Sequence, residues 1–383
     1  MKKSFNLIFI VLIILSMTFA LRASNNMLFT MVPLLGKYDL GFNTVQIGFL
    51  SALFGVFPFL VSAFLNAKLK SLARKKFFIF SAFLYFLSFV MFYFSNKINI
   101  WFLVSIVGFS LGALMPNIIT AAGLCEDKAK RERIIAIYTI TLSTSLIIGP
   151  IIESFLLKIV NLRESFLIFS FFPFIAFVFS FFIQFPNESE DSDEKVSVIK
   201  NPYFLSAILS ILIYNIPFAA LIAFGGIYAK DMFGLDLSTI NLYFSLFFSA
   251  SFLGRLYLVV KPPNKIFHDM IISGILTIVG VFLMIISNSA LVFAISLFIL
   301  GFPHGFTFVL SLISLSRGFD IKQRNKANSY FFSLVNIIGT LTPLIFGYIL
   351  HFLNITMLFY LLLPFALVFL SLLILKLKFS KLI

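Results

Sequence analysis

Apolar stretches of about 20 residues, the length that an α-helix needs to cross a membrane, recur along the whole chain between short polar breaks. Of the 383 residues, 61% are hydrophobic and 11% are charged, whereas soluble domains carry roughly 25% charged residues. A chain of this composition has too few polar side chains to cover itself in water. We therefore expect an all-α integral membrane protein, because apolar runs of this length form spanning helices and not barrel strands.

The apolar runs predict twelve membrane-spanning helices, each bounded by charged residues, glycine, proline or asparagine. In the first half they lie near residues 5–36, 43–66, 77–95, 99–124, 134–158 and 163–185. In the second half they lie near residues 202–230, 237–260, 266–287, 290–315, 327–352 and 356–375. The first run also has features of a cleavable signal peptide, but its apolar pattern continues after Arg22. We therefore interpret it as a helix.

The second half of the chain repeats landmarks of the first half. Arg131 aligns with Arg324 and Pro150 aligns with Pro343, and both pairs are 193 positions apart. The same shift places the motif GFSLG of the first half on GFPHG of the second half. A chain that repeats its landmarks at half its length is built from two copies of one unit.

We accordingly expect two pseudo-symmetric six-helix bundles, at residues 1–185 and 201–383. Residues 186–200, with the sequence PNESEDSDEKVSVIK, form the only stretch polar enough for a solvated cytoplasmic linker. Its acidic run contains the residue types of a metal site, but an exposed tether is the simpler interpretation. The single cysteine, Cys125, excludes an internal disulfide and a cysteine-based metal site.

Lysine and arginine are distributed unequally between the two sides of the predicted membrane. With the amino terminus inside, the outer loops contain only Lys37, Lys97, Lys158, Arg163 and Lys230. Of the 29 basic residues, these five lie in outer loops, Arg22 lies within a helix, and the remaining 23 are cytoplasmic. They include Arg74, Lys75, Arg131 and Arg324 in the cytoplasmic loops. Because basic loops remain in the cytoplasm, we expect both termini there, and the net charge of +14 reflects topology and not a nucleic-acid partner.

Two parallel six-helix halves are the layout of the major facilitator superfamily, which this chain resembles along nearly its whole length. The family loop motif G-x-L-a-D-r-x-G-r-k corresponds to NAKLKSLARKKF, which keeps the basic end but lacks the acid. The exporter motif of helix 5, G-x8-G-x3-G-P-x2-G-G, falls on Ala136, Ser145, Gly149, Pro150, Glu153 and Ser154. The resemblance implies a monomer with a midplane site, lined in part by the first helix and exposed alternately to each side.

Arg22 is the most unusual residue of the predicted spans, because an ionisable group inside a membrane costs about 2.5 to 3.5 kcal/mol on insertion scales. It lies in the first helix, near the midplane of the membrane. Asn25 and Asn26 follow at i+3 and i+4 and share its face. The resemblance implies that this face lines a central cavity, where it contacts substrate. The alternative is a structural arginine neutralised by a neighbouring helix.

Glu153 lies one turn beyond the kink expected at Gly149 and Pro150, in the fifth predicted helix. A carboxyl group in low-dielectric surroundings favours its neutral form, so it is suited to binding and releasing a proton as access alternates. The alternative is a permanent salt bridge between Arg22 and Glu153 that locks the first and fifth helices together.

The second half offers His304, between Pro303 and Gly305, as another proton carrier, since histidine titrates near neutral pH. The alternative is a hydrogen-bonding core histidine. The neutral polar residues of the spans are candidates for substrate contacts or for interhelical hydrogen bonds. They are Asn117, Tyr214, Asn215 and Asn336. The shift places Asn215 on Arg22, at equivalent depth, and Pro343 marks a second expected kink.

The sequence favours a secondary transporter of a small solute, coupled to protons through Glu153 or His304 and located in the plasma membrane among lipids. No phosphate-binding loop of the P-loop type is present, so ATP is not its own energy source. We expect no cofactor, metal or enzymatic activity. The partial helix 5 motif favours efflux. The alternatives are an uptake permease for sugars or organic acids and, in another class, a non-transporting membrane sensor.

Overall fold

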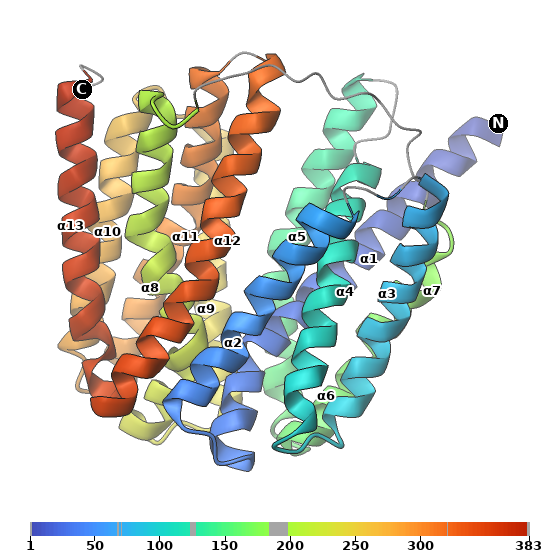
Figure 1. Ribbon diagram of the computed structural model, residues 1–383, viewed down its shortest axis with the longest axis horizontal. Coiled ribbons are helices and arrows are strands. Elements are labelled where there is room, and N and C mark those ends of the chain that lie inside the picture. The colour runs from blue at the N-terminus through green and yellow to red at the C-terminus, as the bar shows by residue number, and fades with distance from the viewer. Residues whose placement is uncertain are drawn as a thin grey trace. The chain divides into compact units, whose positions relative to one another are not determined.

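Helices joined by short connections make up the part of the chain described by the computed structural model, residues 2–66, 69, 71–122, 128–183, 198–319 and 321–380 (Figure 1). The first half contains α1 (Lys2–Leu34), the π-helix η1 (Leu35–Asp39), α2 (Thr44–Leu60), the π-helix η2 (Val61–Leu65), α3 (Ser71–Phe92), α4 (Asn99–Ala122), α5 (Lys128–Leu156), α6 (Leu162–Phe169) and α7 (Phe171–Ser180). The second half contains α8 (Pro202–Phe233), α9 (Leu237–Val260), α10 (Ile266–Ile285), α11 (Ala290–Gly318), α12 (Ile321–Phe352), the 3₁₀-helix η4 (Ile355–Met357) and α13 (Leu358–Phe379).

Among the described residues, eleven helical segments are long and apolar enough to cross a membrane, and the apolar part of α5, Ile140–Leu156, is shorter. These twelve segments confirm the all-α membrane fold and the helices expected from the sequence. The agreement is within a few residues at most ends, and α9 has the predicted bounds.

Three helices begin about six residues earlier than expected. These are α3, α5 and α12, whose first turns contain SLARKK, KAKRER and IKQRNK. Lysine and arginine are good helix formers, so each helix continues past the end of its apolar run. In these three helices the basic residues end the apolar run without ending the helix.

The sixth expected span is divided into α6 and α7 at Ser170. Proline has no backbone N–H to donate within a helix, and Pro173 lies in the first turn of α7. At the start of α6, the Asn161 side chain accepts from the backbone of Glu164 while the Glu164 side chain accepts from the Asn161 backbone. This capping box satisfies two helix-end donors.

The chain separates into two compact units. Unit 1 contains residues 1–42 and 53–190, and unit 2 contains residues 43–52 and 191–383. Helix α2 is therefore shared, because its first turns belong to unit 2 and its remainder to unit 1. The expected linker falls mainly on residues 184–197, which lie outside the described residues.

The two glycine motifs aligned by the sequence shift have the same packing role. In unit 1, a Cβ atom on Gly112 would lie 2.8 Å from the Pro58 carbonyl oxygen, so α4 crosses α2 with no room for a side chain. In unit 2, a Cβ atom on Gly305 would collide with the Ser251 carbonyl oxygen of α9. Small residues four apart let two helix backbones approach closely.

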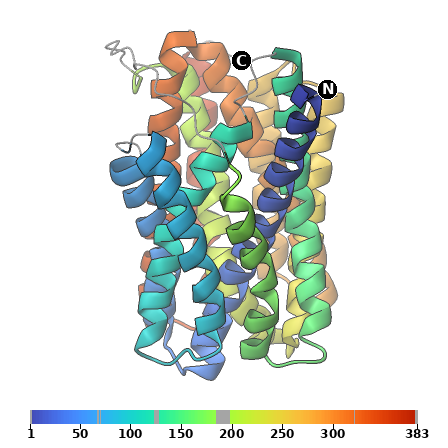
Figure 2. The same cartoon turned by 90° about the vertical axis from the view of Figure 1, so that its right-hand side faces the viewer.

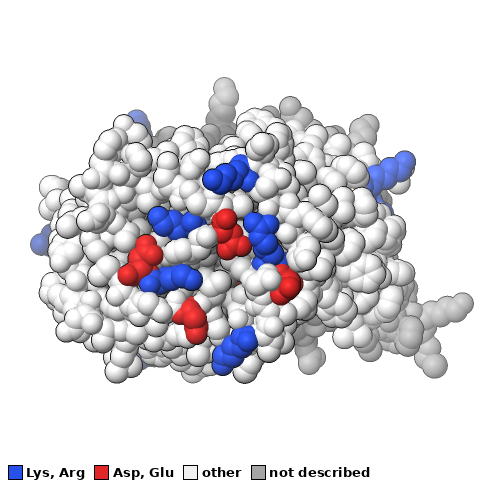
Figure 3. Space-filling model, turned by 90° about the horizontal axis from the view of Figure 1, so that it is seen from below, with Lys and Arg blue, Asp and Glu red and all other residues white. Residues whose placement is uncertain are grey.

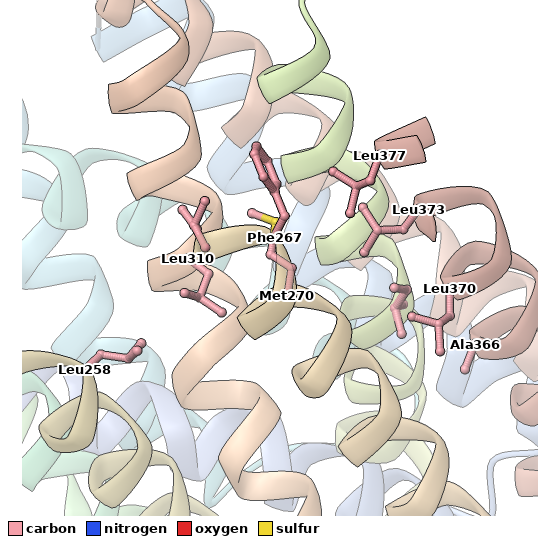
Figure 4. Close-up of a cluster of buried hydrophobic side chains, with 10 residues drawn as sticks. Leu258, Phe267, Met270, Leu310, Ala366, Leu370, Leu373 and Leu377 are labelled. Carbon is pink, nitrogen blue, oxygen red and sulfur yellow. The ribbon is translucent and has the colours of Figure 1, made fainter. Parts of the chain in front are cut away.

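The core of unit 2 includes a cluster of buried aliphatic and aromatic side chains from α8, α9, α10, α11 and α13 (Figure 4). Phe267 and Met270 of α10 lie at its centre, between Leu310 of α11 and the leucines of α13. Leu370 and Leu373 are among these α13 residues. The cluster fixes the helices of unit 2 that carry the polar residues described below.

Three connections of unit 1 are tied together by Arg163 at the start of α6. Its Nε lies 3.2 Å from Asp39 Oδ2 in the α1–α2 connection. Its Nη1 donates to the Ser95 carbonyl oxygen in the α3–α4 connection at 2.6 Å. Seen from below, acidic side chains lie among the basic ones (Figure 3).

Candidate functional site

Helix α1 carries a polar segment at mid-length in unit 1. Arg22 is half-buried, and Asn25 and Asn26 are buried. Considering only the described part of the chain, Arg22 Nε, Asn25 Oδ1 and Asn26 Nδ2 have no hydrogen-bond partner. Buried polar atoms are nearly always paired with protein or water. The segment therefore offers hydrogen-bonding capacity that the fold itself does not use.

The neighbouring residue Ser24 anchors this segment to α3. Its hydroxyl donates to the Ala20 carbonyl oxygen at 2.7 Å and lies 3.0 Å from the hydroxyl of Tyr85. Tyr85 is fully buried and within electrostatic reach of Arg22. The sequence did not identify Tyr85, because its partner is 61 positions away and nothing near it in the chain distinguishes it from a core aromatic residue.

Helix α5 faces α1 with small residues at the exporter-motif positions. A Cβ atom on Gly149 would lie 3.1 Å from the Cα atom of Ala23. Ser145 precedes Gly149 by one turn and Glu153 follows it by one turn, so all three share a face. The close approach of α1 and α5 therefore depends on the small residues, and Glu153 lies directly beyond it. Pro150 lies inside α5.

Glu153 has no exposed surface. The chain reverses direction at each of α2, α3, α4 and α5. Helices α1 and α5 therefore run in the same direction. Four residues beyond Gly149 is about 6 Å along the axis, so the backbone of Glu153 is level with Asn26 and Met27 of α1. The packing thus brings the acid of α5 to the height of the polar segment of α1.

Asn117 lies apart from this polar segment and pairs with a residue that the sequence did not identify. Its side-chain nitrogen donates to Asn66 Oδ1 at 2.8 Å and to the Ala113 carbonyl oxygen at 2.7 Å. This pair joins α4 to the end of η2, where the family motif begins. Arg74 donates to the Leu69 carbonyl oxygen at 2.7 Å in the same connection.

In unit 2, His304 of α11 bonds to Tyr214 of α8, with 2.6 Å between His304 Nδ1 and the Tyr214 hydroxyl oxygen. Three phenylalanines also surround the imidazole ring. The centroid distances are 4.5 Å to Phe218, 5.3 Å to Phe247 and 5.7 Å to Phe248. The geometry fixes the ring orientation and occupies one ring nitrogen.

The other residues singled out from the sequence are dispersed. Asn215 is half-buried and donates to the Val335 carbonyl oxygen at 3.3 Å, and Asn336 is exposed. Pro343 lies inside α12. Lys75 is half-buried on α3. The side chains of Ala136, Arg131 and Arg324 lie outside the described residues.

Helices α2 and α12 form a close crossing within unit 2 that the sequence did not predict. A Cβ atom on Gly347 would lie 2.6 Å from the Thr44 carbonyl oxygen and 3.0 Å from the Cα atom of Gly48. A Cβ atom on Gly48 would collide with the Pro343 carbonyl oxygen. Two glycines on different helices thus face one another.

Across the described residues, no group of three or more histidine, cysteine or acidic side chains could hold a metal ion.

A family model described as Major Facilitator Superfamily matches residues 14–266 and 270–381. The chain belongs to the major facilitator superfamily. It is therefore a multi-pass membrane transporter protein, and the resemblance drawn from its two six-helix halves is confirmed. No curated protein matches the chain by sequence.

Solved structures of other superfamily transporters share the fold at low sequence identity. A bacterial homologue of the human lysosomal transporter Spinster, in an inward-facing and occupied conformation, is 14% identical with a TM-score of 0.69, covering 99% of this chain and 96% of that one. The nucleoside transporter NupG is 12% identical with a TM-score of 0.76, covering 96% and 99%. A POT family transporter in complex with 5-aminolevulinic acid is 13% identical with a TM-score of 0.77, covering 97% and 96%.

Proposed function

We propose that this superfamily member is a proton-coupled secondary transporter that moves a small solute by alternating access, with Glu153 as the proton carrier. The observation that carries the proposal is the complete burial of Glu153 at the height of the α1 polar segment. A buried carboxyl must be paired or protonated to be stable in low-dielectric surroundings. A change in its surroundings therefore changes its affinity for a proton.

His304 is the weaker candidate for this role. The Tyr214 hydroxyl occupies one ring nitrogen, and four aromatic rings surround the imidazole. These contacts are those of a hydrogen-bonding core histidine. We assign the Tyr214–His304 pair to positioning of α8 against α11, next to substrate contacts from Asn215.

The solute class that fits unit 1 is anionic or amphipathic. Within the part of the chain that the structure describes, the half-buried Arg22 contributes a positive charge and an unused Nε donor, and Asn25 and Asn26 contribute an unused acceptor and an unused donor. A carboxylate or phosphate group accepts hydrogen bonds from arginine. One structurally similar protein is a nucleoside transporter and another is in complex with 5-aminolevulinic acid, and at 12–14% identity these structures support the fold alone.

The small residues of α5 that permit close packing at Ser145 and Gly149 favour efflux, with an uptake permease as the alternative direction. The bias of basic residues supports a plasma-membrane protein with both termini in the cytoplasm. We propose that it acts as a monomer, as its resemblance to the superfamily implies.

Purified protein in liposomes that contain a pH-sensitive dye tests the coupling. A mixed panel of drugs, sugars, organic acids and amino acids is applied to the wild type, to Glu153→Gln and to the control Glu164→Gln, which alters a half-buried capping carboxylate. We expect solute-dependent proton movement in the wild type and the control, and none in Glu153→Gln. Solute movement without a proton signal, equal in all three proteins, would show that Glu153 is structural. A protein that moves no solute would leave the sensor alternative.

A further inference from the structure

A crevice of about 530 Å³ lies in unit 1 between α1, α5 and α7, outside the polar cluster described above. Its floor is formed by Leu15, Ser16, Phe19 and Ala20 of α1. Its walls are Thr141 of α5 and Phe172, Ile175 and Phe179 of α7. Small-molecule pockets occupy about 300–1,000 Å³, so the crevice has the size of a binding site.

The crevice exists because α5 and α7 both pack against α1, which forms its floor. Figure 2 shows α7, in green, beside α1, in blue. At Gly149 the helices α1 and α5 touch. Thr141 lies eight residues earlier on α5, about 12 Å along the axis, and there the space between the helices is open.

The lining predicts a hydrocarbon ligand. It contains no charged residue, and the Thr141 hydroxyl already donates to the Ile137 carbonyl oxygen at 3.0 Å. Seven of the eight lining residues are half-buried, so the crevice is open and not a closed void. The α1 and α7 residues belong to membrane-spanning segments, so the crevice lies at the depth of the bilayer interior.

We propose that the crevice is a saturable site for one acyl chain of a membrane phospholipid, distinct from the lipid that covers the rest of the surface. The chain inserts from the bilayer between α5 and α7 and lies on the α1 floor. It separates α1 from α5 on the side of the Gly149–Ala23 contact away from Glu153. This assignment is independent of the solute and of proton coupling.

Two adjacent phenylalanines of α7 provide a matched pair of reporters at the same membrane depth. Phe172 lines the crevice and packs against Phe19, with 5.9 Å between ring centroids. Phe171 is 62% exposed and does not line it. The chain contains a single tryptophan, so wild-type protein gives the fluorescence background for Phe172→Trp and Phe171→Trp.

Detergent-purified variants are titrated with phosphatidylcholine brominated on its acyl chains, which quenches nearby tryptophan. We expect Phe172→Trp to show quenching that saturates near one lipid per protein, and Phe171→Trp to show quenching that rises in proportion to the lipid fraction. Adding Ser16→Phe to Phe172→Trp places a ring on the crevice floor and should remove the saturable phase. Circular dichroism and gel filtration verify that this variant remains folded.

Equal quenching curves for the two tryptophan variants would overturn the proposal, as would a saturable phase that persists with Ser16→Phe. Displacement of the brominated lipid by a transported amphipathic solute at equal concentration would assign the crevice to the solute and overturn the phospholipid assignment. Native mass spectrometry gives an independent measurement. One retained phospholipid in the wild type, and none in folded Ser16→Phe, is the expected result.

Discussion

Substituting Gly347 by alanine should force apart the crossing of α2 and α12. The added Cβ atom would lie 2.6 Å from the Thr44 carbonyl oxygen, whereas ordinary contacts begin at 3.4 Å. The helices must therefore separate by several tenths of an ångström. Overpacking of this kind costs about 1–3 kcal/mol, and replacing glycine by alanine within a helix returns about 0.8–1.0 kcal/mol.

Gly339 provides a matched control in the same helix. A Cβ atom there meets nothing within 4 Å, so Gly339→Ala gains the helix propensity without the steric cost. The difference between the two variants isolates the steric term of about 1–3 kcal/mol. For a domain of about 200 residues, 1 kcal/mol moves Tm by about 2–4 °C, so Gly347→Ala should melt about 2–12 °C below Gly339→Ala.

Thermal unfolding of the purified variants in one detergent measures this difference, and liposome flux shows whether transport is affected as well. Equal Tm values for Gly347→Ala and Gly339→Ala would refute the close crossing of α2 and α12. A lower Tm for both variants would refute the assignment of open space around Gly339.

Two further sets of substitutions test polar contacts of unit 1 by thermal unfolding. Arg163→Lys keeps the charge near Asp39 but cannot also donate to Ser95, and each lost hydrogen bond costs about 0.5–1.5 kcal/mol of stability. Asp39→Asn removes only the half-exposed ion pair and should cost about 0.2–1 kcal/mol. Equal losses of stability in the two variants would contradict the role of Arg163 in tying the connections together. Asn117→Leu leaves Asn66 buried without its partner, at about 1–3 kcal/mol. The double variant with Asn66→Leu should recover part of this loss, and strict additivity would rule out the pair.

The helices were predictable because membrane-spanning segments carry their signal in local composition. Each apolar run has the length that the hydrocarbon core demands, and α9 was placed with the bounds that it has in the structure. The starts of α3, α5 and α12 were wrong by about six residues because a basic turn ends an apolar run without ending a helix. Helix propensity and hydropathy are different properties, and they diverge at the basic ends of these three helices.

The site was predictable only where one helix supplied the pattern. Arg22 and Asn26 stand out because polar residues are rare within spans. Tyr85 and Asn66 were missed because their partners lie 61 and 51 positions away, and no local signal separates a buried tyrosine that bonds from one that only packs. The pairing of distant polar residues is set by helix packing, which composition does not specify.

The duplication supplies an internal comparison for Glu153. The shift of 193 residues places Phe346 at its equivalent position, and Phe346 is also buried, at 2% exposure. An apolar side chain therefore satisfies packing at this position in one half, so the carboxyl in the other half is not required by packing alone.

This comparison gives a prediction that separates proton coupling from a salt bridge. Replacing a whole buried ion pair by apolar residues of similar volume is often neutral or stabilising by about 1–4 kcal/mol, whereas removing only one partner of the pair costs about 3–5 kcal/mol. If Glu153 carries protons, Glu153→Met should keep or raise the Tm and abolish solute-dependent proton movement. If Glu153 mainly locks α5 to Arg22 of α1, the Tm should fall sharply, and Arg22→Met in the same protein should restore it. Measuring Tm and proton flux on the same preparation decides between the two roles, because only the lock predicts that the second substitution rescues the first.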